Sequence, residues 1–262
     1  MRKHGIASSI LSLANPWLDF LAADEAGEWA GKVNDEMDEL CRVNDQEAQG
    51  EYPPFYAFGA LPLSAPTPEV IVQEIKRLKA LTYMKGVIMG TSGLGKGLDD
   101  SALDPVWAAL DETKTVLFLH PHYGLPSDAF GGADVVERYG HVLPLALGFP
   151  LETTIAVARM YLARVFDRFT GLKVLLAHSG GSIPFLAGRI ESCVAHERRF
   201  VRNGVYTLGP EKSIWDVLGQ NIYLDAVVYG EPGLNAAVQA GSVDRVMFGA
   251  YNRSHLNGNL VF

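Results

Sequence analysis

Two histidines follow short apolar runs of the kind found in buried strands. His120 comes after residues 115–119 (TVLFL), and His178 comes after residues 173–177 (KVLLA). A neutral imidazole is a common metal ligand and a frequent general acid or base, and a strand end can aim it into a site. Either residue alone could equally be a hydrogen-bonded loop histidine. Two such strand ends favour function and predict that both imidazoles face one cavity.

The residues next to these histidines refine that prediction. His122 lies two positions after His120, and we expect only one of the two rings to point inward. Gly180 and Gly181 follow His178, where they permit close approach of the backbone to a ligand. A helix that begins near Pro184 would add N–H groups able to hold an anion. A plain turn between strand and helix is the alternative.

Polar residues also end two other expected strands. Asp225 closes the run IYLD and could be a ligand or a general base, although fixing a neighbouring loop by hydrogen bonds is slightly preferred. Asn15 precedes Pro16 and offers an amide to a carboxylate or carbonyl group, but Asn-Pro also starts turns well. Both residues therefore keep two interpretations.

Residues 90–97 (GTSGLGKG) nearly match a phosphate-binding P-loop that follows a strand. Gly97 replaces the Ser or Thr that would hold magnesium, and Asp99 and Asp100 bring acidic groups near any phosphate. We therefore favour a flexible active-site loop over a nucleotide site.

The elements that position these residues alternate along the chain, which predicts a parallel sheet with covering helices. Polar residues at several strand ends favour a (β/α)8 barrel, because those ends converge on one face of a barrel. A long loop is expected over residues 121–147. The expected strands are residues 5–14, 55–63, 85–89, 115–119, 173–177, 222–225 and 245–248, and the expected helices are residues 24–43, 68–80, 102–110, 152–169, 183–199 and 233–240.

Composition narrows the class of protein. The 262 residues form one expected domain, 1–262, and 48% of them are hydrophobic. A net charge of −8 gives no support for a nucleic-acid partner. Cys41 and Cys193 are too few for a disulfide framework, so a reduced, cytoplasmic setting is expected. No apolar run approaches the ~20 residues of a membrane span, so no membrane partner is expected.

Several motifs together resemble the aminocarboxymuconate-semialdehyde decarboxylase family, which is related to the amidohydrolases. Within that family the chain is most similar to the fungal isoorotate (uracil-5-carboxylate) decarboxylases, chiefly through residues 90–100 and 120–126. The similarity extends over residues 5–249. The motifs are LANPW (13–17), GALPL (59–63), FLHPH (118–122), GFPLETT (148–154), AHSGG (177–181) and FLAGRI (185–190).

The resemblance implies a (β/α)8 barrel and a metal-dependent, non-oxidative carboxy-lyase. Its substrate would be a small aromatic or pyrimidine carboxylic acid such as uracil-5-carboxylate or 6-methylsalicylate, and its metal Zn²⁺ or Mn²⁺. His120 matches a metal ligand of the family and His178 a histidine that assists proton transfer and substrate placement. Asn15 matches a substrate-contacting asparagine, and Phe149 is expected to line the pocket. A homo-oligomer is also expected.

The chain departs from the family pattern at both ends. It begins where the second strand is expected and stops before an eighth helix, so we expect a barrel that lacks its first strand and last helix. No H-x-H pair lies upstream, and Tyr251 stands where the family has a metal-binding aspartate. The metal site is therefore expected to be incomplete. An inactive truncated form, a non-catalytic paralogue or assembly partner, and a metal-dependent amidohydrolase remain alternatives.

Overall fold

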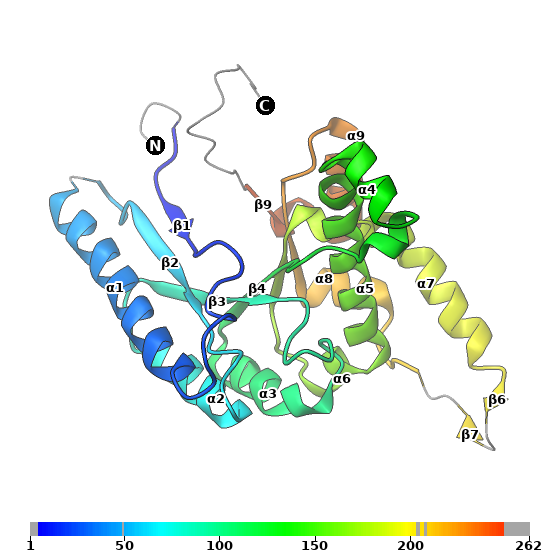
Figure 1. Cartoon of the computed structure of the whole chain (residues 1–262), viewed down its shortest axis with the longest axis horizontal. Coiled ribbons are helices and arrows are strands. Elements are labelled where there is room, and N and C mark those ends of the chain that lie inside the picture. Colours follow the sequence, from blue (N-terminus) through cyan, green and yellow to red (C-terminus); the bar gives the residue numbers. More distant parts are fainter. Residues whose placement is uncertain (1–4, 49, 203–204, 207–208, 249–262) are drawn as a thin grey trace.

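A curved parallel sheet forms the centre of the structure (Figure 1). The computed structural model describes residues 5–48, 50–202, 205–206 and 209–248. Within them seven strands follow the order β1-β2-β3-β4-β5-β8-β9, and every neighbouring pair is parallel. The strands are β1 (Ser9–Leu11), β2 (Phe55–Ala60), β3 (Met84–Gly90), β4 (Val116–His120), β5 (Val174–Leu176), β8 (Ile222–Asp225) and β9 (Val246–Met247).

Helices connect the strands, as parallel pairing requires. Sequence marks several helix starts: Pro68 follows the N-cap Thr67, and Ser213 and Asp216 form a reciprocal capping box. The α-helices are α1 (Ala26–Glu47), α2 (Pro68–Leu78), α3 (Asp104–Thr113), α4 (Ala133–Tyr139), α5 (Phe149–Leu162), α6 (Val165–Arg168), α7 (Ile183–Glu197), α8 (Ile214–Gln220) and α9 (Glu231–Gly241).

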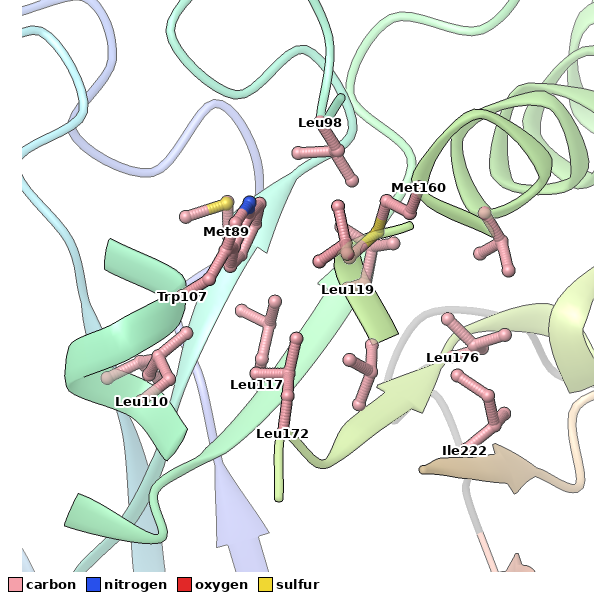
Figure 2. Packing of buried hydrophobic residues seen from close by; sticks show 14 of the residues in the cluster. Met89, Leu98, Trp107, Leu110, Leu117, Leu119, Met160, Leu172, Leu176 and Ile222 are labelled. Atoms are coloured by element: carbon pink, nitrogen blue, oxygen red, sulfur yellow. The ribbon is translucent and has the colours of Figure 1, made fainter. Parts of the chain in front are cut away.

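The two faces of the sheet carry different apolar clusters. Leu117 and Leu119 of β4 are fully buried in the main core with Trp107 of α3 and Met160 of α5 (Figure 2). The alternate residue, Phe118, packs with a second cluster of Trp17, Phe58, Ile88 and Leu175. Because side chains alternate along a strand, His120 shares the face of Phe118. The strand pattern thus turns His120 toward the inside of the curved sheet.

The predicted alternation of strands and helices is confirmed, and the barrel expected without its first strand and last helix is confirmed only as a coarser architecture. The described part of the chain forms seven parallel strands in a curled half-barrel. The first strand is also shorter than residues 5–14, since only Ser9–Leu11 pairs with β2.

Three connecting regions differ from the prediction. Residues 121–147 are not a plain loop, because they contain the 3₁₀ helix η3 (Ser127–Phe130), α4 and the start of the π-helical turn η4 (Pro144–Gly148). The helix expected over residues 152–169 is broken at Arg164, whose φ is +61°. Helix α8 and the hairpin of β6 (Val201–Arg202) and β7 (Val205–Tyr206) were missed, because both are short.

No single helix in the described residues is long and apolar enough to cross a bilayer. Residues 133–139 and 144–162 pass that length and composition test only when taken together, and they are bent by 108°.

Candidate active site

The two histidines predicted from strand ends lie side by side. The ring centroids of His120 and His178 are 5.3 Å apart. β4 and β5 are neighbours in the sheet, with Leu119 paired to Leu176, so His120 ends one strand and His178 lies just beyond the end of the next. This distance confirms that the two imidazoles lie close together, and the roles predicted for them stay predictions.

Aromatic rings surround the histidine pair. Phe149, the first residue of α5, stacks on His178 with centroids 6.2 Å apart and meets His120 at 6.5 Å. Trp17 and Phe118 each approach the His120 ring at 6.1 Å. Phe149 therefore contacts both histidines, while the pocket-lining role expected from the family stays a prediction; Trp17 is a neighbour that the sequence analysis did not name as a site residue.

Burial among these rings keeps the imidazoles uncharged at neutral pH. Desolvation lowers the pKa of His178 to about 4, with a smaller contribution from His120. Desolvation also lowers the pKa of His120, although the Pro121 carbonyl and Glu152 oppose the shift. Nδ1 of His120 lies 2.8 Å from the Pro121 carbonyl oxygen, so Nδ1 carries the proton in the neutral ring and the lone pair is on Nε2.

The turn that carries His178 has an unusual backbone. His178, Ser179, Gly180 and Gly181 all have positive φ, at +54°, +51°, +75° and +62°. Glycine adopts this region freely, but it costs other L-residues roughly 1–2 kcal/mol each. Strain of this kind persists only where the surroundings hold it in place.

Asp225 holds that turn from the end of β8. Its Oδ1 accepts hydrogen bonds from the backbone N–H of Ser179 at 2.8 Å and of Val227 at 3.1 Å. The Ser179 hydroxyl donates to the Asp225 carbonyl oxygen. Burial raises the pKa of Asp225, while backbone N–H groups, including that of His178, oppose this shift. The structure confirms the preferred interpretation of Asp225 as a residue that fixes a neighbouring loop.

Glu152 is a connecting residue that the sequence analysis missed. Its carboxylate accepts hydrogen bonds from the backbone N–H of His122 at 2.7 Å, from the backbone N–H of Gly124 and from the Thr91 hydroxyl. The loops after β3 and β4 thereby share one anchor on α5. The spacing of Glu152 three residues after Phe149 was the available signal, since both lie in the first turn of one helix.

His122 is more buried than expected. It is only 5% exposed, its ring lies 5.2 Å from Trp17, and its Nε2 is 3.4 Å from Asp19. The expectation that only one of the two rings points inward is wrong: residues two positions apart in an extended chain share a face, and both rings contact Trp17. Desolvation raises the pKa of Asp19 to about 6 and lowers that of His122.

Asn15 lies in the same loop as Trp17. Its side-chain amide donates a 2.9 Å hydrogen bond to the carbonyl oxygen of His122. The loop after β1 is thereby tied to the segment that follows His120. The substrate contact predicted for Asn15 stays a prediction.

The glycine-rich loop after β3 is held by contacts with Arg159 of α5. Arg159 of α5 donates to the Lys96 carbonyl oxygen at 2.7 Å and pairs with Asp99 at 2.6 Å. Its guanidinium lies against Gly97, where a Cβ atom would overlap it. A cavity of about 280 Å³ lies between this loop and α5. Arg159 thus holds this loop against α5, and the flexible active-site role expected for the loop stays a prediction.

The described residues offer two neighbouring imidazoles but not a complete metal shell. Within them, no group of three or more His, Cys, Asp or Glu side chains is placed to hold a metal ion. The Asp225 carboxylate accepts backbone N–H groups instead. Tyr251, which stands at the family's aspartate position, lies outside the described residues. Metal binding by His120 therefore stays a prediction.

Comparison with known proteins agrees with this architecture. The amidohydrolase family model matches residues 16–250. The chain belongs to the amidohydrolase family. This amidohydrolase-family chain is 36% identical to the 2-amino-3-carboxymuconate-6-semialdehyde decarboxylase of Dictyostelium discoideum over 168 residues. The aligned region covers 63% of this chain and 44% of the relative.

Solved structures show the same fold. The apo crystal structure of Metarhizium anisopliae IDCase is 54% identical, with a TM-score of 0.85 over 95% of this chain and 63% of the IDCase chain. A dihydroxybenzoic acid decarboxylase from Polaromonas, with bound manganese and the inhibitor 2-nitroresorcinol, is 26% identical, with a TM-score of 0.74 over 95% and 72% of the two chains. The present chain thus spans less than two thirds of the length of the Dictyostelium decarboxylase and of IDCase.

Proposed function

We propose that this chain acts as a non-oxidative decarboxylase for an aromatic or pyrimidine carboxylic acid, with uracil-5-carboxylate as the favoured substrate. The 54% identity with IDCase over 95% of the chain carries the proposal. The adjacent His120 and His178 rings, with Phe149 stacked on one of them, support it as a place for a flat, anionic ring.

Decarboxylation breaks the bond between the ring carbon and the carboxylate. CO2 leaves, and the electron pair that remains on the ring carbon forms a bond to a proton taken up from solvent, so one proton is consumed for each CO2 released. Because His120 and His178 are uncharged at neutral pH, they would hold the substrate by hydrogen bonds rather than as cations. Phe149 would pack against the substrate ring. The apolar surroundings of the site would strengthen the hydrogen bonds from the two histidines to the substrate.

Relatives indicate the metal to supply in a test. The Polaromonas relative holds manganese, and the family resemblance also allows zinc. We therefore propose assays with each metal added separately.

The deciding experiment incubates the purified protein with uracil-5-carboxylate and Mn²⁺ or Zn²⁺ and measures uracil and CO2. Equal amounts of the two products are expected. H120A and H178A should each lower the rate by about 100-fold or more, as expected for loss of a group that orients or protonates substrate. H196A is the matched control, because His196 is exposed on α7 and contacts Phe200.

The alternatives give different results. A non-catalytic paralogue or assembly partner would release neither uracil nor CO2 with either metal. A metal-dependent amidohydrolase would instead release ammonia from the matching amide, uracil-5-carboxamide. Light scattering of the same preparation tests the proposed homo-oligomer.

A further inference from the structure

We propose that Asp225 is a positioning residue for His178: it holds residues 178–181 in the left-handed turn that aims the His178 imidazole at His120 and Phe149. The catalytic consequence rests on the proposed decarboxylase function. The position of the His178 imidazole does not depend on that function, and it can be measured in protein that is not turning over substrate.

The backbone supplies the first argument. Four consecutive residues, 178–181, have positive φ, and the first two carry side chains that disfavour this region. Without external contacts, His178 and Ser179 would relax to negative φ. That relaxation would redirect the Cα–Cβ bond of His178 and carry its ring away from Phe149.

The contacts of Asp225 supply the second argument. Its carboxylate accepts the Ser179 and Val227 N–H groups, and its carbonyl accepts the Ser179 hydroxyl. The side chain is placed by the sheet and not by a flexible loop, because Leu224 pairs with Leu176 of β5. Asp225 is only 7% exposed, so water competes little for these hydrogen bonds.

Helix α5 contacts the end of the same turn on the side opposite Asp225. The backbone N–H of Ser182 donates to Thr154 Oγ1 at 2.8 Å, and a Cβ at Gly181 would overlap the Pro150 carbonyl oxygen. The same helix begins with Phe149, which stacks on His178. The turn therefore lies between two fixed surfaces, and Asp225 is the contact on the sheet side.

The experiment follows the His178 ring by NMR in protein labelled at histidine and phenylalanine. Wild type should show a cross-relaxation contact between the rings of His178 and Phe149, with ring-current-shifted His178 protons. D225A should lose both signals. D225N should keep them, because asparagine retains an acceptor oxygen for the Ser179 and Val227 N–H groups.

A rescue variant separates positioning from general loosening. D225A/S179G should regain a large part of the His178–Phe149 contact, because glycine adopts positive φ without strain. D167A is the matched control: Asp167 also accepts two backbone N–H groups, those of Glu211 and Lys212, but it lies on α6. D167A should leave the His178 signals unchanged.

The kinetic arm uses uracil-5-carboxylate. D225A should lower kcat by about 100-fold with a smaller change in KM, and D225A/S179G should recover part of it. If wild type shows no decarboxylation, the proposed function fails while the NMR arm still decides the position of His178. A D225A protein that keeps the ring contact overturns the proposal, as does loss of the contact in D167A as well. If D225A does not fold, D225S takes its place under the same criteria.

Discussion

The ends of β4 and β5 each supply one histidine of the site, and they hold it in different ways. His120 is the last residue of its strand, so the alternation of β4 points it to the inner face beside Phe118. β5 ends at Leu176, and His178 lies beyond it in a turn with positive φ that Asp225 holds. The comparison teaches that a side chain within a strand is aimed by local geometry, whereas one beyond the strand depends on contacts from other elements.

The largest effect is expected where the turn of His178 meets α5. In G181A the new Cβ would overlap the Pro150 carbonyl oxygen at a φ of +62°, so the free energy of unfolding should fall by about 3 kcal/mol or more. G95A is the matched control, since Gly95 has a φ of +94° but open space around its Cβ, and should cost only about 1 kcal/mol. Urea denaturation followed by circular dichroism measures both. Equal losses would show that the packing against α5 is unimportant.

A smaller loss of stability is expected when Glu152, which anchors the loop after His120, is replaced. E152A removes the acceptor for the N–H groups of His122 and Gly124 and for the Thr91 hydroxyl. Leaving these donors unpaired should lower the free energy of unfolding by about 2–3 kcal/mol. E39A should have a much smaller effect than E152A, because Glu39 forms an exposed ion pair with Arg42 that solvent screens. The comparison would fail if thermal melts of E152A and E39A coincided.

Acid should act on the two regions with opposite signs. The pKa of His178 is lowered to about 4 from 6.5 by burial, so the unfolded chain binds the proton first as pH falls from 6.5 to 4. This contribution to the free energy of unfolding falls by up to about 3 kcal/mol over that range. Asp19, near His122, has a pKa raised by burial to about 6 from 3.8. The folded chain therefore binds that proton first, and its contribution rises by up to about 3 kcal/mol as pH falls from 6 to 3.8.

Single substitutions separate these contributions. Relative to wild type, D19N should lose stability more steeply between pH 6.5 and 4, and H178N should lose it less steeply. Urea titrations at several pH values measure both slopes. Parallel curves for the three proteins would contradict the opposite signs.

The smallest effect is expected at Asn15. Its hydrogen bond to the His122 carbonyl is at an exposed residue, so N15A should lower the free energy of unfolding by only about 0.5–1 kcal/mol. The predicted substrate contact would appear separately, as a higher KM for uracil-5-carboxylate. An unchanged KM would leave Asn15 only its structural role of tying the β1 loop to the β4 loop.

The sequence predicted well what short-range patterns determine. Short apolar runs located most strands. The histidines that follow two of these runs were enough to predict that His120 and His178 lie close together. The family resemblance added Phe149, which lines the pair. These successes depend on strand periodicity and on motifs, which both act over a few residues.

Contacts between residues far apart in the chain were harder to predict from the sequence. Glu152 lies about 30 residues from the loop that it anchors, and its spacing from Phe149 in the first turn of α5 does not reveal which backbone groups it binds. The burial of His122 depends on Trp17 and Asp19, which come from the distant loop after β1. The left-handed φ of Ser179 could not be expected from a serine, since it depends on Asp225, which is 46 residues away.

The shared anchor at Glu152 limits how such a barrel can change during evolution. The loops after β3 and β4 are where a barrel enzyme ordinarily alters its specificity. Here both loops bind one carboxylate on α5, so an insertion in one loop would pull on the other. Loop grafts between relatives should therefore exchange the two loops together with the first turn of α5, as a single inherited block.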